Sequence, residues 1–435
     1  MTILKNKALV VWSLLFLTLF AYLLFADEKL KPATAEWMSV FQQNLESEDN
    51  ASLRLLSLGN VDAIFTNALN ENYRKKLDAF EFNGLLSDEK PMKYPNVLQF
   101  EAFIESPLFC DFNNRDCVAR VKREADYIKI VVKEFQPELV DFMSLNEVSS
   151  FKSLNPFVAE LNLSDFLFLF KLKGTEIFFD IEEGRIEKAQ QDLMSLILLN
   201  RQFFSSSDNL LTKISFSLNT QSIYQPLLLS LKAKGAFPQE IYDNVLRPLS
   251  MQEVSANNIQ IFSFAKNARL IKAGLAAREK NSSGSLLSRL WQRLVYKQNV
   301  TLNDMFDEYQ ALLLPDYVNK PSLLAFSQNI DEQIREKSDE QQKQPFVYHL
   351  KNLNNVVGAS LKDVIMPRQI NLYHSIAKLD TRLQLLRLVL NGNANELVES
   401  MQLDSFSNYY TGERPFIVDG SICSKINNEN ICVAF

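Results

Sequence analysis

LNLSDFLFLFKLKGTEIFFDIEEGRIEKAQQDLMSLILLNRQFF, residues 161–204, is the most regular stretch of this 435-residue chain. It reads as two helices that meet near Glu183 and Gly184, and the second helix carries a stripe of apolar residues at helical spacing. The stripe consists of Ile186, Ala189, Leu193, Leu196, Ile197 and Phe204. The whole chain has only 11 Gly, and long segments lack both Gly and Pro. These features predict a helical hairpin within a mainly α fold.

The turn of this hairpin carries small residues. Gly184 is followed five residues later by Ala189, which resembles the turn of tetratricopeptide repeats, where a small residue lets two helices approach closely. No second copy of the pattern occurs at a period near 34 residues. We therefore expect Gly184 and Ala189 to set a helix crossing in a solenoid-like array of hairpins, without a regular repeat.

The first helix of the hairpin contains the aromatic run FLFLF at residues 166–170. Its three Phe residues lie two apart, so they cannot all share one helical face. The run predicts a helix that is buried on most sides. A groove facing lipid or a partner is the alternative.

The N-terminus predicts a membrane anchor. Two lysines within residues 1–7 precede residues 8–26, which are uncharged. A helix of this length spans about 28 Å, close to the hydrocarbon thickness of a bilayer. The lysines favour a cytoplasmic N-terminus and export of the rest of the chain. A cleaved signal peptide is the alternative, although its cleavage site at Ala26 would follow Leu24 where a small residue is usual.

The exported part divides into three regions by composition. Residues 27–35 are polar and contain Pro, which predicts a linker. Residues 36–400 are predicted to form an extracytoplasmic helical domain, and residues 401–435 an extended tail. Within the domain, Thr301 is the expected N-cap of a helix, with Asp304 placed three residues later as in a capping box.

The four cysteines form two local pairs. Cys110 and Cys117 lie seven residues apart, and Cys423 and Cys432 lie nine apart. Disulfides persist in the oxidising compartments that export would reach. Of the three possible pairings we favour Cys110–Cys117 and Cys423–Cys432. Zinc binding is less favoured because zinc ligands within a pair are usually two to four residues apart, and catalytic thiols would need a nearby histidine.

Charge and motifs argue against several classes of function. The net charge of −6 disfavours a nucleic-acid partner, which normally meets a basic face. The sequence has no zinc-protease motif, phosphate-binding loop or nucleophile elbow, and no cofactor is predicted. We expect His349 and His374 to be structural. The acidic pairs Asp180 with Glu183 and Asp304 with Asp307 are expected to be solvated on helix turns.

Several motifs, taken in order, resemble a group of uncharacterised proteins encoded by Gram-negative bacteria. After the anchor they are FCDFNNRDCVARV, GRIEKAQQDLMSLILLNRQFF, NVTLNDMF, NNVVGASLKDV and YYTGERPFIVD. The tail keeps Thr411, Gly412 and Pro415 of the group's pattern, whereas Asn408 and Tyr409 stand where the group often has Asp-Pro. Val356 likewise replaces a Pro in the central motif. The resemblance implies an inner-membrane protein with a periplasmic helical domain, and it implies no activity.

Three hypotheses for function follow. The first is a single-span inner-membrane protein whose periplasmic domain scaffolds or binds another envelope protein, with Thr411, Gly412 and Pro415 shaping a terminal turn. The second is an envelope hydrolase that uses paired carboxylates, or Ser beside a histidine, in a cleft. The third is a carrier of lipid or another hydrophobic ligand, which would require a continuous apolar cavity.

Overall fold

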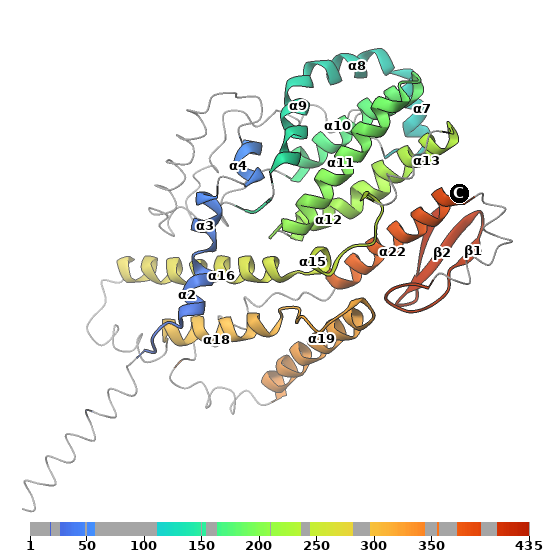
Figure 1. Ribbon diagram of the computed structural model, residues 1–435. Coiled ribbons are helices and arrows are strands. Elements are labelled where there is room, and N and C mark those ends of the chain that lie inside the picture. The colour runs from blue at the N-terminus through green and yellow to red at the C-terminus, as the bar shows by residue number, and fades with distance from the viewer. Residues whose placement is uncertain are drawn as a thin grey trace, which may run out of the picture.

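A computed structural model describes most of the chain after the N-terminus. The described residues are Thr18, Asn355 and the ranges 27–47, 50–56, 111–148, 150–153, 163–208, 210–235, 244–281, 296–343, 372–392 and 407–434. This part is mainly helical, with a small antiparallel sheet near the C-terminus (Figure 1). The predicted anchor, residues 8–26, lies outside the described residues apart from Thr18. Among the residues that are described, none belongs to a helix both long enough and apolar enough to span a bilayer.

The N-terminal half contains short helices followed by a long hairpin. The short helices are α2 (Pro32–Met38), α3 (Val40–Glu46), α4 (Ala51–Leu56), α7 (Arg115–Arg123), α8 (Ala125–Glu134), α9 (Gln136–Ser144) and the 3₁₀ turn η3 (Leu145–Glu147). The hairpin is α10 (Leu163–Glu182) and α11 (Ile186–Ser206). The helical hairpin predicted for residues 161–204 is therefore confirmed.

The C-terminal half continues with helices and ends in the sheet. A long helix is formed by α12 (Leu210–Asn219), the π-helical segment η4 (Thr220–Tyr224) and α13 (Gln225–Ala233). Next come α15 (Met251–Val254), α16 (Asn257–Asn281), α18 (Gln298–Ala311), α19 (Lys320–Lys343) and α22 (Leu372–Asn391). The strands are β1 (Phe416–Val418), β2 (Ser421–Ile426) and β3 (Glu429–Ala434).

Helix α10 lies at the centre of the main core. It packs against α8, α9, α11, α12 and α13, and its side chains from Phe168 to Phe170 and from Leu172 to Thr175 are buried. This agrees with the prediction that the FLFLF run belongs to a helix buried on most sides. The side chain of Phe166 lies outside the described residues.

A second, smaller core lies between α2, α16 and α18, which pack against one another, with α16 and α18 running side by side in Figure 1. Phe264 on α16 and Phe306 on α18 are buried in it. Trp37 on α2 contacts both rings edge-on, with centroid distances of 5.6 Å and 4.7 Å. The N-terminal segment of the chain is thereby packed onto helices more than 200 residues away.

The start of one helix differs from the sequence prediction. Helix α18 begins at Gln298, so Thr301 lies inside it and is not the N-cap; its hydroxyl donates to the carbonyl oxygen of Lys297 at 2.8 Å. Further along the chain, α15 and α16 are separated by a break at Ser255 and Ala256. The break follows the short helix α15, which is closed by a capping box between Ser250 and Glu253.

The terminal sheet has the order β1-β2-β3 and packs on α22. Both of its hairpins close with two-residue turns, Asp419-Gly420 and Asn427-Asn428, and all four residues have positive φ. This is the type I′ geometry whose twist matches that of paired strands, and Asn, Asp and Gly adopt it most readily. The tail predicted as extended is thus a three-stranded sheet over the part that the structure describes.

Candidate functional sites

Asp380 on α22 is a buried carboxylate whose hydrogen-bond partners come from three distant parts of the chain. One carboxylate oxygen accepts the backbone N–H of Leu249 at 2.7 Å. The other accepts Lys320 Nζ of α19 at 2.6 Å and the hydroxyl of Tyr410 at 2.9 Å. Burial, reinforced by the Asp380 carboxylate, raises the pKa of Tyr410. Asp380 therefore joins three separate segments of the chain to α22, and both of its carboxylate oxygens accept hydrogen bonds from within the fold.

The side chain of Asn408 attaches the turn before the terminal sheet to α22, the helix that carries Asp380. Its amide nitrogen donates to the hydroxyls of Thr381 on α22 and Ser424 on β2, at 3.1 Å and 2.9 Å. Its side-chain oxygen accepts the backbone N–H groups of Tyr410 and Thr411. Asn408 is thus the side chain that fixes the turn to the domain, a role that the sequence motif did not reveal.

The three residues predicted to shape this turn all lie in it. Gly412 has a φ of +68° and donates its N–H to the carbonyl oxygen of Asn408 at 2.8 Å. The hydroxyl of Thr411 accepts the backbone N–H of Glu413, and Pro415 is buried. Their roles in the structure are local and conformational.

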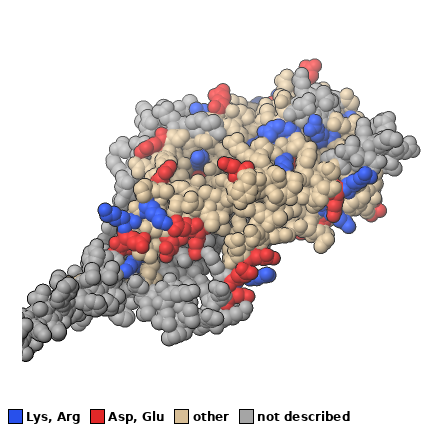
Figure 2. Space-filling model, turned by 60° about the horizontal axis from the view of Figure 1, so that its bottom comes forward, with Lys and Arg blue, Asp and Glu red and all other residues tan. Residues whose placement is uncertain are grey.

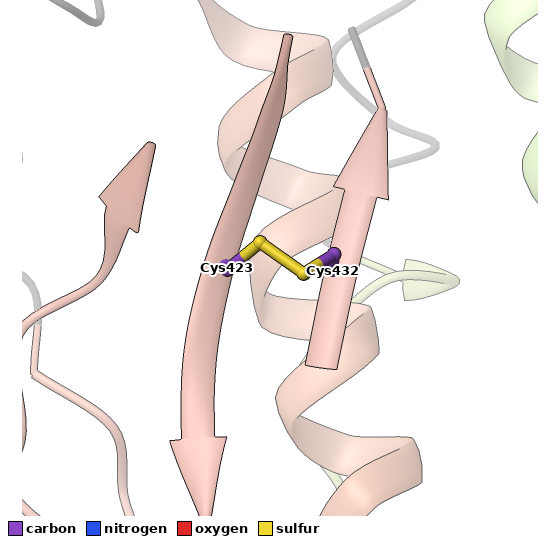
Figure 3. Close-up of a disulfide and its surroundings, with 2 residues drawn as sticks. All are labelled: Cys423 and Cys432. Atoms are coloured by element: carbon purple, nitrogen blue, oxygen red, sulfur yellow. A yellow bond between two sulfur atoms is a disulfide. The ribbon is translucent and has the colours of Figure 1, made fainter. Parts of the chain in front are cut away.

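The second cysteine pair forms the predicted disulfide, Cys423–Cys432 (Figure 3). The two residues face each other directly across β2 and β3. Because side chains alternate along a strand, the disulfide lies on the opposite face of the sheet from Ser424, which contacts Asn408. Cys117 is also disulfide-bonded. Cys110 lies outside the described residues, so the Cys110–Cys117 pairing stays a prediction.

Gly184 ends α10 for a different reason from the expected close approach. Its φ is +79°, and a Cβ atom at this position would meet nothing within 4 Å. The N–H of Arg185 bonds to the carbonyl oxygen of Asp180, and the N–H of Gly184 to that of Ile181, as in a Schellman motif. Ala189 is fully buried in the main core. The positive φ, rather than small size, is therefore what this turn needs from Gly184.

A close approach between two helices is instead found at Gly174, in the middle of α10. A Cβ atom there would lie 2.6 Å from Cγ2 of Ile223 in the π-helical segment η4. The same segment receives the loop before α7, because Phe112 donates its N–H to the carbonyl oxygen of Ser222 at 3.1 Å. A lone glycine inside a helical pattern was the available signal for this contact.

Acidic residues gather between α10 and α11. Glu176, Asp180 and Asp192 each have an oxygen within 4.8 Å of the others, a geometry that could hold a metal ion. Lysines already bond to all three: Lys173 Nζ lies 2.8 Å from both Glu176 and Asp192, and Lys188 Nζ lies 2.6 Å from Asp180. The expectation that Asp180 is solvated is wrong, since it is buried. The cluster is an ion-pair network that joins the two helices.

A second buried network organises the chain before α15. Arg201 on α11 donates two hydrogen bonds to the carboxylate of Glu253, at 2.9 Å and 3.0 Å, and two more to the carbonyl oxygens of Val245 and Arg247. Burial opposes ionisation of Glu253, but the hydrogen bonds and charge of Arg201 outweigh it and lower the pKa of Glu253 to about 2. The pair positions the loop whose Leu249 bonds to Asp380.

In the part of the chain that the structure describes, His374 bonds to Asn427 and Glu429 and not to a serine. The Nδ1 atom of His374 lies 3.2 Å from the side-chain nitrogen of Asn427, and its Nε2 atom lies 3.6 Å from the carboxylate of Glu429. His374 thus links α22 to the β2–β3 turn. His349 lies outside the described residues.

The comparisons with known proteins give no relative. No family model matches the chain, no curated protein matches it, and no solved structure matches it.

Proposed function

We propose that this chain is an envelope protein of a Gram-negative bacterium, anchored in the inner membrane by residues 8–26, whose periplasmic domain binds another envelope protein. The uncharged N-terminal segment behind two lysines supports the anchor. The Cys423–Cys432 disulfide supports an oxidising compartment, and the five motifs support the bacterial group. The packing of successive helices against each other, as in the α10–α11 hairpin, supports a solenoid-like domain.

The observation that carries the binding role is an apolar stripe on α12. Leu210, Ile214 and Leu218 lie one helical turn apart, and 42%, 37% and 49% of their surfaces are exposed. Single exposed apolar residues are common, but three in successive turns on one helix form a continuous strip about 12 Å long. We name this set the α12 stripe.

The α12 stripe carries no charge. Lys213, the one charged residue of α12, points inward and donates to the carbonyl oxygens of Glu253 and Ser255 at 3.2 Å and 2.7 Å. Burial lowers its pKa to about 8. An uncharged, apolar row of this spacing suits the apolar face of a helix in a protein partner, which would present side chains at the same interval.

One face of the molecule shows side chains of both charges. On the face drawn in Figure 2, Lys and Arg side chains and Asp and Glu side chains form small patches around a wide uncharged area. Such a distribution suits a protein partner better than a polyanion.

The test is photocrosslinking in living cells with p-benzoylphenylalanine in place of Ile214. We expect an adduct with one envelope protein, identified by mass spectrometry, and its loss when Leu218 is replaced by Glu. Val140 on α9 is the matched control, because it is an apolar residue with 59% exposure outside the stripe.

The outcomes separate a binding protein from a lipid carrier. A protein adduct at position 214 that is absent at position 140 supports a binding protein. An adduct with lipid alone at position 214 overturns this proposal in favour of a carrier. Equal adducts at both positions, or none at either, overturn the α12 stripe as a binding surface.

A further inference from the structure

The segment directly after the predicted anchor, Asp27–Lys31, is fixed along the first three turns of α18. It forms neither helix nor strand, the backbone of Lys31 is extended, and α2 begins at the next residue, Pro32. Residues 27–35 were predicted to be a linker, yet the described structure attaches their first half to the helical domain. We name Asp27–Lys31 the stem.

The stem begins as the cap of α18. The carboxylate of Asp27 accepts the backbone N–H groups of Asn299 and Val300, at 2.9 Å and 3.2 Å. These are among the N–H groups that a helix start leaves without a partner, and Lys297 at the N-cap position makes no side-chain cap. The side chain of Asn299 returns a hydrogen bond to the carbonyl oxygen of Glu28 at 2.8 Å.

The contacts continue at one-turn intervals along α18. Asn303 donates to the carbonyl oxygen of Lys29 and accepts the backbone N–H of Lys31, both at 3.0 Å. One turn further, Asp307 bonds to Lys31 Nζ at 2.6 Å. Asn299, Asn303 and Asp307 are spaced four residues apart, so the stem and α18 run in the same direction.

The lengths of the two segments agree with this arrangement. Eight residues of helix from Asn299 to Asp307 cover about 12 Å, and four extended residues from Asp27 to Lys31 cover at most about 14 Å. Leu30 packs against the second core at the same place. The stem therefore has almost no spare length between its contacts with Asn299 and Asp307.

From this geometry we infer that the edge of the domain formed by the stem and the first turn of α18 rests against the phospholipid headgroups of the bilayer. The inference rests on the anchor of the proposed function. If the span ends at Ala26, the next residue is already bonded to α18. The headgroup layer is roughly 5–8 Å thick on each side, about the length of two extended residues, so the first turn of α18 reaches it.

The test places p-benzoylphenylalanine at position 298 or, separately, at position 317 of the full-length protein. Gln298 is the first residue of α18 and is partly exposed. Tyr317 is 84% exposed and lies beyond the other end of α18, whose 14 residues are about 21 Å long. Each variant is inserted into vesicles of phosphatidylethanolamine and phosphatidylglycerol and irradiated, and lipid adducts are measured by intact mass.

A lengthened stem is the matched control. Inserting ten Gly and Ser residues between Ala26 and Asp27 leaves every stem contact in place, but it adds a flexible span of about 18 Å between anchor and domain. We expect at least fivefold more lipid adduct at position 298 than at position 317. The insertion should reduce the adduct at position 298 to the level at position 317.

Each outcome has a distinct meaning. Protein that stays in the vesicles but gives equal adducts at both positions overturns the headgroup contact and leaves the anchor intact. An adduct at position 298 that the insertion does not change also overturns it, because the contact would then not depend on the stem. Protein that alkaline washing removes from the vesicles overturns the anchor itself, and with it the proposed function.

Discussion

The α10–α11 hairpin and the stem are held in place by different kinds of contact. The hairpin pairs helices that are adjacent in the sequence, and its apolar residues repeat with the period of a helix. The stem is fixed by Asp27, Asn303 and Asp307, through hydrogen bonds between residues about 270 positions apart. Periodic apolar residues thus build the elements, whereas single polar residues decide where distant segments attach.

Two other aspartates act as Asp27 does. Asp380 holds Leu249, Lys320 and Tyr410, which lie 131, 60 and 30 residues away. Asp208, directly after α11, accepts the backbone N–H of Ser153 at 2.9 Å and the side-chain amide of Asn44 at 3.1 Å. From this comparison we predict that changes of charge or pH alter the stability contributed by these aspartates. Changes of side-chain volume should instead alter the stability contributed by the hairpin.

The largest effect is expected for Asp380→Asn. The change leaves Lys320, which is mostly buried, without its counter-charge, and breaking a buried pair in this way costs about 3–5 kcal/mol. Urea unfolding of the full-length protein in detergent measures the loss. The exposed pair of Lys378 with Glu429 is the control, and Lys378→Gln should cost less than about 1 kcal/mol.

The double variant with Lys320→Met checks the cause. Removing both charges should recover part of the lost stability, since no uncompensated charge remains. Equal losses for Asp380→Asn and Lys378→Gln would show that Asp380 does not have this special role.

The second largest effect is a pH dependence of the protein's stability that arises from Asp208. Burial raises the pKa of this carboxyl to about 6, whereas in the unfolded chain it is near 4. The folded state therefore binds the proton more tightly, and stability falls as pH rises from about 4 to about 6. Two pKa units correspond to about 3 kcal/mol.

The measurement compares the wild type with Asp208→Asn, so that other titrating groups cancel. Relative to wild type, the variant should gain about 3 kcal/mol in unfolding free energy between pH 4 and pH 7. A difference between the two proteins that stays constant over this range would contradict the assignment.

The substitution Gly174→Ala tests whether the hairpin is sensitive to side-chain volume. The added methyl group would lie 2.6 Å from Ile223, and such overpacking costs about 1–3 kcal/mol, offset in part by the better helix propensity of Ala. We expect a net loss of about 1–2 kcal/mol in unfolding free energy. Ile223→Ala in the same chain should reduce the cost of Gly174→Ala.

Gly184→Ala provides the contrast. Its cost is also about 1–2 kcal/mol, because Ala tolerates a positive φ poorly, but Ile223→Ala should not reduce it. If Ile223→Ala changed neither cost, steric contact at Gly174 would be the wrong explanation.

The smallest effect is expected for Asp27→Ala. Loss of a helix cap costs about 1 kcal/mol, and thermal unfolding followed by circular dichroism measures it. Asp27→Asn should retain most of the stability, because an amide oxygen can accept the same N–H groups. Identical melting of the Ala and Asn variants and the wild type would show that the cap does not stabilise α18.

The parts of the fold that local sequence determines could be predicted. The hairpin, the mainly α class and the second disulfide follow from periodicity, few glycines and cysteine spacing. The N-cap of α18 could not be predicted, because Thr301 has the right residue type and the actual cap comes from Asp27. The central role of Asp380 was also hidden, since its partners lie in three distant segments and a single Asp on a helix has no distinctive pattern. The tail could be predicted only as extended, because its strands are short, with three, six and six residues.

The contact between Asp27 and Asn299 also sets an order of events during synthesis. The 272 residues between them take roughly 14–54 s to translate at about 5–20 residues per second. During that time the stem has no binding site, and the second core lacks its third helix. The residues of the stem are therefore among the last to reach their native place, so an early part of this chain completes its folding late.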